Sequence, residues 1–197
     1  MWKVTLCAFE DMEVLDFAGP FEVFSVANQL KAYQLLTLQV ASVTDERIVR
    51  AKNGLTIVAD TSLAAVFETD MLIIPGGDGS KALLENTEAM QDISRLNGHA
   101  KLTWSVCSGA RILAALGVLD RQPFTTHHLV IEDVQKLTKN GFFVDKRFVK
   151  TGKYATAAGV SAGIDLALHM LLALTDSHFV KQVARYMEYP YIEHESY

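Results

Sequence analysis

The sequence predicts an α/β protein with an open, mostly parallel sheet covered by helices on both faces. Apolar runs of strand length alternate along the chain with segments whose apolar residues recur at helical spacing. One predicted strand, residues 71–74, is apolar at every position, as buried parallel strands are. It stops at Pro75-Gly76-Gly77, and another strand, residues 102–106, runs directly into Cys107. Such loops are typical of the carboxyl edge of a parallel sheet, where reactive groups collect.

Length and composition are those of one globular domain covering residues 1–197. Half of the residues are hydrophobic, 21% are charged, and no Pro-, Gly- or Ser-rich tract marks a linker. The net charge is −5 without a Lys/Arg cluster, so we expect no nucleic-acid partner. The longest apolar stretch, residues 166–174, is too short for a membrane span, and the amino terminus does not read as a secretory signal. We therefore expect a cytoplasmic protein with no membrane partner.

The first half of the chain opens with a βα unit. Its predicted strands comprise residues 2–9, 35–43 and 71–74, with a peripheral hairpin of residues 48–49 and 55–58. Gly19-Pro20 precedes residues 21–28, whose apolar spacing predicts a helix with Pro20 in its first turn. Asn53-Gly54 predicts the turn of the hairpin.

The second half continues the alternation. It predicts strands at residues 102–106, 142–144 and 154–156 and helices at residues 88–96, 108–116, 130–137 and 164–174. Asn86-Thr87 can cap the first of these helices, and Gly98 and Gly117 are stop signals for the first two. Residues 189–197 have lost helical periodicity and are expected to run over the surface.

Cys107 lies at the joint between a predicted strand and a helix. Ser108, Gly109 and Ala110 are small enough to let a sharp turn close, and the N–H groups of the new helix would favour the thiolate. A buried cysteine that only fills space is the alternative, and it is our interpretation of Cys7 in the first strand. These two cysteines have no spacing typical of a disulfide framework or a metal knuckle.

A thiolate needs a proton partner, and three residues are candidates. Asp16 and Glu13 follow the first strand, whose carboxyl end opens on the same side as that of the strand before Cys107. A partly buried carboxylic acid there would have a raised pKa and could donate a proton, although Asp16 can equally stabilise a helix start. His127 lies in a loop that can face the same crevice as a base, but lone histidines are more often structural. His127 and His128 are adjacent and not placed for metal binding, so no metal is predicted.

The loop Gly76-Gly77-Asp78-Gly79 follows an apolar strand. Its backbone N–H groups can converge on a developing negative charge or a bound substrate, or the glycines can serve only a tight turn. The loop lacks the GxGxxG frame with a downstream acid, so we expect no dinucleotide and no other cofactor.

Four segments carry a resemblance that spans nearly the whole chain: LDFAGPFEVF, IIPGGDGS, WSVCSGARILAALGVLDRQPFTTHH and AAGVSAGIDLALHML. With them the chain resembles the ThiJ/PfpI superfamily of glutamine amidotransferase-like proteins, and within it the branch that contains isonitrile hydratase. The resemblance implies a flavodoxin-like three-layer sandwich, a homodimer, and Cys107 as the nucleophile in a strained elbow. It further implies that the thiolate attacks an isonitrile carbon, that Asp16 handles the proton with Glu13 as second choice, and that water completes an N-substituted formamide.

One departure from the superfamily pattern narrows the activity. Its proteases place histidine directly after the cysteine, whereas this chain has Ser108, so protease activity is not expected. The hydratase branch commonly has threonine there, and Ser108 keeps the hydroxyl. The leading expectation is a cofactor-independent cysteine enzyme, an isonitrile hydratase-like lyase, acting on a small electrophilic substrate. The alternatives are a glyoxalase or deglycase that draws on Glu13 and His127, and a non-enzymatic redox- or ligand-sensing module.

Overall fold

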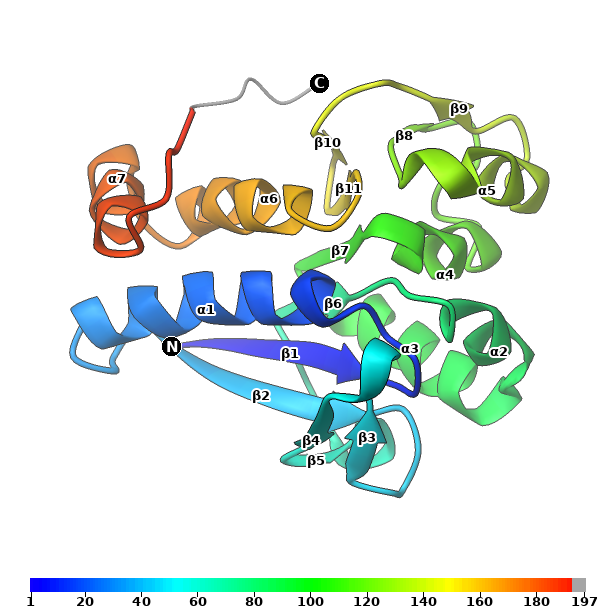
Figure 1. The fold of residues 1–197 in the computed structure, drawn as a ribbon, viewed down its shortest axis with the longest axis horizontal. Helices are drawn as coiled ribbons and strands as arrows, with labels where there is room; N and C mark the ends of the chain where they lie inside the picture. Colours follow the sequence, from blue (N-terminus) through cyan, green and yellow to red (C-terminus); the bar gives the residue numbers. More distant parts are fainter. Residues whose placement is uncertain (193–197) are drawn as a thin grey trace.

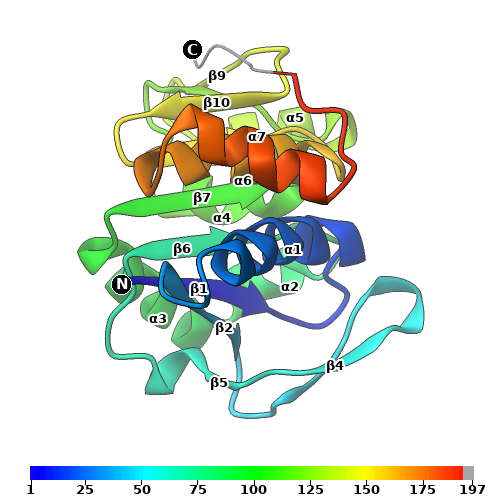
Figure 2. The same ribbon diagram turned by 90° about the vertical axis from the view of Figure 1, so that its left-hand side faces the viewer.

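The computed structural model describes residues 1–192 and is built on a seven-stranded sheet with the order β10-β11-β7-β6-β1-β2-β5 (Figures 1 and 2). The strands are β1 (Trp2–Ala8), β2 (Leu36–Ser42), β5 (Thr61–Ser62), β6 (Met71–Ile74), β7 (Leu102–Val106), β10 (Phe148–Thr151) and β11 (Tyr154–Ala157). Neighbouring strands are parallel, except that β10 pairs antiparallel with β11. The predicted mostly parallel sheet is confirmed.

Helices cover both faces of this sheet, which gives the three layers of a flavodoxin-like fold (Figure 2). One face carries α1 (Val14–Leu30), α6 (Ala162–Met170) and α7 (Ser177–Tyr186). The other face carries α2 (Ser80–Glu85), α3 (Thr87–His99), α4 (Ala110–Ala115) and α5 (Ile131–Leu137). The alternation along β6 explains why the strand is apolar throughout: Met71 and Ile73 enter one core, and Leu72 and Ile74 enter the other.

The predicted peripheral hairpin is also present, outside the main sheet. Strands β3 (Ile48–Arg50) and β4 (Thr56–Val58) pair antiparallel with each other. Asn53 and Gly54 at the turn have φ values of 65° and 97°, the left-handed conformation that this dipeptide adopts readily. A second small sheet pairs β8 (Pro123–Phe124) with β9 (Phe142–Phe143).

Three predicted boundaries are wrong for physical reasons. Helix α1 begins at Val14, so Pro20 lies inside it rather than in its first turn, and Asp16 falls within that first turn. Pro20 has no N–H, so one backbone hydrogen bond of the helix is missing at this position. The helix nevertheless continues to Leu30. The predicted helix of residues 108–116 starts with a 3-10 turn, Cys107–Gly109, before α4. Helix α3 runs through Gly98 to His99, with Asn86 capping its start as predicted.

Several elements escaped the sequence analysis altogether. They are β5, β8, β10, α2 and α7. Strands β5 and β8 have only two residues each, too few for any periodicity to show. Of the predicted surface tail, residues 193–197 lie outside the described residues, and Tyr189 is held by a hydrogen bond from its hydroxyl to Asp165 Oδ1 (3.0 Å).

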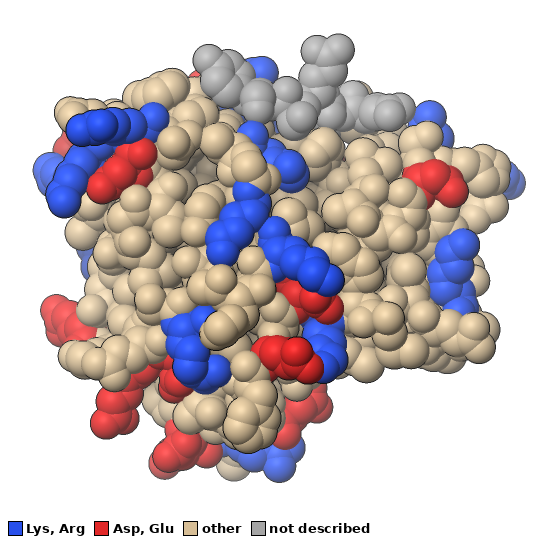
Figure 3. Space-filling model, turned by 180° about the vertical axis from the view of Figure 1, so that it is seen from behind, with Lys and Arg blue, Asp and Glu red and all other residues tan. Residues whose placement is uncertain are grey.

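The surface and the helices add two observations relevant to partners. On the face shown in Figure 3, Lys and Arg side chains are interspersed with Asp and Glu. Within residues 1–192, no helix combines the length and the apolar character needed to cross a bilayer. The absence of a nucleic-acid partner stays a prediction.

Candidate active site

The carboxyl ends of three neighbouring strands, β1, β6 and β7, bring the predicted site residues together. Asp16 follows β1 in the first turn of α1, the glycine loop follows β6, and Cys107 follows β7. Since parallel strands end at the same edge of a sheet, these loops meet in the crevice where α/β proteins place their ligand sites.

Cys107 sits in a strained turn that its neighbours hold in place. Its φ of 55° lies in the left-handed region, which costs a non-glycine residue roughly 1–3 kcal/mol. The Cys107 N–H donates to Ala158 O (2.8 Å), and the Thr126 hydroxyl donates to Cys107 O (2.7 Å). A Cβ on Gly109 would lie 2.5 Å from Ile74 O, so the turn closes only with glycine there. The predicted elbow is therefore present, with backbone contacts on both sides.

Asp16 provides a buried carboxyl beside this thiol. The residue is fully buried, and its Oδ2 accepts a hydrogen bond from the Gly76 N–H (3.0 Å). Burial raises the pKa of Asp16 to about 7, against the opposing effect of the Gly76 hydrogen bond, and the charge of Glu13 adds to the rise. The carboxyl and the Cys107 thiol each shift the pKa of the other, and among residues 1–192 the buried Oδ1 has no hydrogen-bond partner. Asp16 is thus the buried acid that is electrostatically coupled to the thiol.

The pKa of the Cys107 thiol is raised, whereas the sequence analysis predicted a lowered one. Burial raises the pKa of Cys107 to about 12, and the negative charge of Asp16 adds to the rise. Hydrogen bonds from the backbone N–H groups of Ser108 and Val160 favour the thiolate and offset part of this. The N–H group of Ser108 thus favours the thiolate as expected, but burial outweighs it and the expected lowering of the pKa is not found. Cys107 and Asp16 are better described as a coupled pair that shares one proton.

The two glycine N–H groups predicted to bind an oxyanion or substrate are already engaged within the protein. The Gly76 N–H binds Asp16, and the Gly77 N–H donates to Ser108 Oγ (2.8 Å). Asp78 has an 80% exposed side chain that pairs with Lys52 Nζ at 3.1 Å. The glycine loop therefore holds the Asp16 carboxyl and the Ser108 hydroxyl, while a direct role of Gly76, Gly77 and Asp78 in binding stays a prediction.

Gly77→Ala is expected to lower the free energy of unfolding by at least about 2 kcal/mol. Gly77 has a φ of 120°, and an added Cβ would lie 2.3 Å from Asp11 O. Gly98→Ala, in helix α3, is the matched control, since no atom from elsewhere in the described part of the chain would lie within 4 Å of its Cβ. Urea unfolding should show Gly98→Ala equal to or more stable than the parent; equal stability of the two variants would contradict the close packing of this loop.

Glu13 and His127 lie near the pair without bonding to the thiol. The Glu13 carboxylate is 3.7 Å from Lys52 Nζ, and its backbone N–H donates to Gly76 O. The His127 Nδ1 accepts a hydrogen bond from the Leu129 N–H (3.3 Å), and burial lowers the pKa of this histidine, as does the adjacent His128. Of the two candidate acids, Asp16 is the one that interacts directly with Cys107.

A cavity of about 310 Å³ adjoins this site. It is lined by residues 125–128 and 158–160 together with Phe143 and Asp145. Three of its wall residues, Thr126, Ala158 and Val160, hydrogen-bond Cys107. The volume is that of a small organic molecule rather than of a peptide.

The elbow, the buried acid and the fold agree with a comparison to known families, in which the sequence profile of the DJ-1/PfpI family matches residues 2–173. The chain belongs to the DJ-1/PfpI family. An isonitrile hydratase from Pseudomonas putida is 28% identical over 188 residues, which cover 95% of this chain and 78% of that protein. A glutathione-independent glyoxalase, DJR-1.2 of Caenorhabditis elegans, is 27% identical over 160 residues, covering 80% and 83% respectively.

Solved structures of the DJ-1/PfpI family share the fold. A crystal structure of a ThiJ/PfpI family protein from Pseudomonas syringae superimposes with a TM-score of 0.86 at 25% identity, covering 98% of this chain and 76% of that one. The family thus includes enzymes with different substrates, and the substrate must be argued from the site of the individual member.

The sequence analysis missed two residues of this family member's site. Val160 donates its N–H to the thiol from a left-handed conformation (φ 44°), unusual for a β-branched residue. The only signal was its place between Gly159 and the start of α6. Lys52, in the hairpin turn, influences the titration of Asp16 and His127 by its charge. Nothing in the turn pattern around Lys52 indicated that the hairpin folds over the site.

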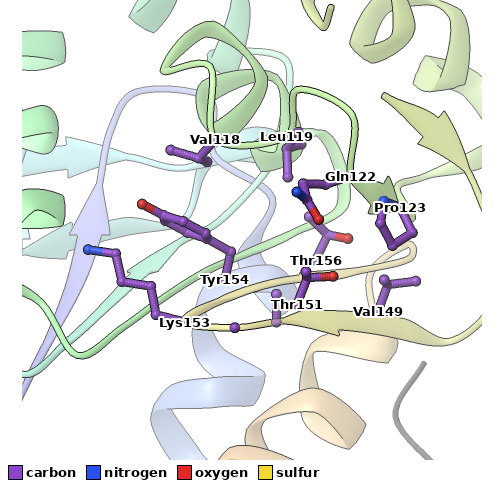
Figure 4. Close-up of a pocket in the computed structure, with 11 residues that line it drawn as sticks. Val118, Leu119, Gln122, Pro123, Val149, Thr151, Lys153, Tyr154 and Thr156 are labelled. Atoms are coloured by element: carbon purple, nitrogen blue, oxygen red, sulfur yellow. The ribbon is translucent and has the colours of Figure 1, made fainter. Parts of the chain in front are cut away.

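A separate cavity of about 190 Å³ lies between the segment after α4 and the β10–β11 hairpin (Figure 4). None of the candidate site residues lines it. Its one charged side chain, Lys153, donates to the carbonyl oxygens of Asn97 and Ala100, and its ammonium lies 5.3 Å from the Tyr154 ring centroid. The ammonium group of Lys153 is therefore already bound by groups of the protein. This cavity is separate from the site around Cys107.

Proposed function

We propose that this protein is a cofactor-independent cysteine enzyme that hydrates an isonitrile to an N-substituted formamide. The observation that carries the proposal is the fully buried Asp16 carboxyl, whose pKa of about 7 lets it exchange a proton with Cys107 near neutral pH. The likeness to the isonitrile hydratase of Pseudomonas putida supports the choice of substrate class.

The first half of the proposed reaction adds the S–H group across the isonitrile carbon. A proton moves from the thiol to the Asp16 carboxylate, and the thiolate forms a C–S bond with the terminal carbon. Asp16 then returns its proton to that carbon, which leaves a thioimidate, R–N=CH–S–, on Cys107. The N–H groups of Ser108 and Val160 stabilise the sulfur while it carries negative charge.

The second half consumes one water molecule. Asp16 removes a proton from water as the water oxygen attacks the thioimidate carbon, and Asp16 passes that proton to the nitrogen. The C–S bond then breaks as the new hydroxyl group becomes the carbonyl and its proton passes through Asp16 to the sulfur, so that the formamide R–NH–CHO leaves and the thiol is restored. Ser108 can donate its hydroxyl hydrogen bond to the substrate nitrogen, which becomes more basic during both additions. The adjoining cavity would hold the organic group R.

Cyclohexyl isocyanide is the first substrate to test, because its product is stable and easily detected by NMR. We expect N-cyclohexylformamide whose oxygen comes from ¹⁸O-labelled water and whose formyl hydrogen becomes deuterium in D₂O. Both labels follow from the atoms exchanged in the two steps. Absence of the formamide with protein that has an alkylatable Cys107 would overturn the proposal.

A glyoxalase is the second candidate, because Glu13 and His127 lie near the site and the family includes DJR-1.2. Conversion of methylglyoxal to lactate, measured in parallel, decides between the two. If neither reaction occurs and mild peroxide adds two oxygen atoms to Cys107, the remaining alternative is a redox-sensing module.

A further inference from the structure

A buried arginine lies under the elbow and is used by none of the steps above. Arg111, in α4, has a side chain that is only 5% exposed. Its Nη2 is 2.5 Å from Asp133 Oδ2, and its Nη1 donates to Ser80 Oγ (2.9 Å). Its Nε is buried without a hydrogen-bond partner among residues 1–192. A buried guanidinium with one donor unsatisfied is costly, so its presence under a nucleophile needs an explanation beyond packing.

The contacts of Arg111 continue as a chain of hydroxyl groups to the residue after the nucleophile. Ser80 is fully buried and begins α2, and its Oγ lies 2.7 Å from Gly77 O and 3.3 Å from Ser108 Oγ. Ser108 Oγ in turn accepts from the Gly77 N–H and lies 3.0 Å from Gly77 O. The chain therefore runs from Arg111 through Ser80 to Gly77 and Ser108.

The number of protons on each group determines which group donates in each of these hydrogen bonds. Arg111 can only donate, so Ser80 Oγ accepts from it and has its single hydroxyl proton to give. The shorter of the two available contacts sends that proton to Gly77 O. Gly77 O is then satisfied without Ser108, and the Ser108 hydroxyl proton can turn to a reacting molecule without leaving a buried carbonyl unpaired.

The same chain fixes the backbone of Ser108. Its side chain is anchored to Gly77, and a Cβ on Gly76 would lie 2.6 Å from Ser108 N and 2.7 Å from Asp16 Oδ2, so the three groups are packed closely. The Ser108 N–H that stabilises the thiolate belongs to this unit. Loosening Ser80 would loosen both the hydroxyl and the N–H of Ser108.

We infer that Arg111 is a positioning residue that acts through Ser80 to free the Ser108 hydroxyl proton and to hold the Ser108 N–H on the thiolate. The kinetic part of this inference rests on the proposed hydratase function, while the thiol part does not. Asp133 neutralises the charge of the Arg111 guanidinium. Because the Asp133 side chain is 41% exposed, removing Arg111 does not leave a buried negative charge without a partner.

Arg111→Leu, Arg111→Lys and Ser108→Ala, alone and combined, test the inference by two readouts. The first is kcat and KM for isonitrile hydration, and the second is the rate of Cys107 alkylation by iodoacetamide against pH. We expect Arg111→Leu to lower kcat roughly tenfold with little change in KM and to slow alkylation at neutral pH, with partial rescue by Arg111→Lys. In the Ser108→Ala background, Arg111→Leu should cause no further loss of kcat.

Arg95→Leu is the matched control. Arg95 also pairs with an aspartate, Asp92, and donates to two backbone carbonyls, but those partners lie outside the site. Its loss should change neither readout. If Arg111→Leu does not fold, Ser80→Ala breaks the same link without removing a charge.

Equal losses from Arg111→Leu in the parent and in the Ser108→Ala background would assign Arg111 a purely structural role and overturn the inference, as would an Arg111→Leu variant identical to the parent. If the parent has no hydratase activity, the proposed function fails while the alkylation readout still decides the effect of Arg111 on the thiol.

Discussion

Cys107→Ser is expected to lower isonitrile hydration by about 10⁴-fold or more, the largest loss of any single substitution in this protein. The replacement keeps the shape of the elbow but removes the thiol that forms the thioimidate in the proposed reaction. A serine hydroxyl is far less acidic than a thiol, and Asp16, with a pKa of about 7, is too weak a base to ionise it. Initial rates with cyclohexyl isocyanide, with intact-protein mass spectra for trapped adducts, provide the measurement.

Cys7→Ala is the control for this experiment. Cys7 is also a free cysteine, but it is fully buried in β1, and burial alone raises its pKa to about 12. Its replacement should leave both the hydration rate and the alkylation of Cys107 unchanged. Full activity in Cys107→Ser, or loss of activity only in Cys7→Ala, would remove the elbow from the mechanism.

The fold was largely predictable because its central strands carry an unambiguous pattern. Residues 71–74 are apolar at every position, and the structure places them as β6 between β7 and β1. The position of Cys107 at the carboxyl end of the next strand followed from the same reasoning. Short edge elements such as β5 could not be predicted, because two residues carry no period and their pairing with β2 is a tertiary effect.

The site was predictable as a set of residues but not in its electrostatics. Sequence position brought Asp16 and Cys107 together, since both follow parallel strands. It did not reveal that burial would outweigh the helix amino terminus in setting the pKa of Cys107, because burial depends on side chains from elements distant in the chain. The engagement of the Gly76 and Gly77 N–H groups by Asp16 and Ser108 is equally invisible in the motif.

Asp16→Asn is expected to stabilise the protein at pH 8. The same substitution should remove the rise in the alkylation rate of Cys107 that the parent is expected to show near pH 7. The pKa of Asp16 is about 7 in the folded protein, against about 3.9 in an unfolded chain. Between these values the folded state holds a proton that the unfolded state releases, so the stability of the parent falls as pH rises from about 4 to about 7 and stays low above that range. Asparagine has no charge to bury and escapes this loss.

The expected size of the stability effect follows from the same two pKa values. Their difference corresponds to at most about 4 kcal/mol, and relaxation around the ionised carboxylate should reduce this to roughly 2 kcal/mol at pH 8. At pH 4, where the carboxyl is protonated, the two proteins should differ little. Urea unfolding at both pH values provides the measurement, and a difference that does not grow with pH would contradict the raised pKa of Asp16.

The pH dependence of Cys107 alkylation tests the coupling of Asp16 and Cys107 through the thiol. In the parent, the form with one proton shared between Asp16 and Cys107 becomes populated as pH rises through about 7, so the alkylation rate should rise there to a plateau. Asp16→Asn should lack this step and show only the titration of the thiol, whose pKa falls because the neighbouring negative charge is gone. Glu13→Gln should keep the step and move it slightly downward, since the Glu13 charge raises the pKa of Asp16. A step lost in Glu13→Gln and retained in Asp16→Asn would instead make Glu13 the proton partner, and a site of that kind would favour carbonyl chemistry over isonitrile hydration.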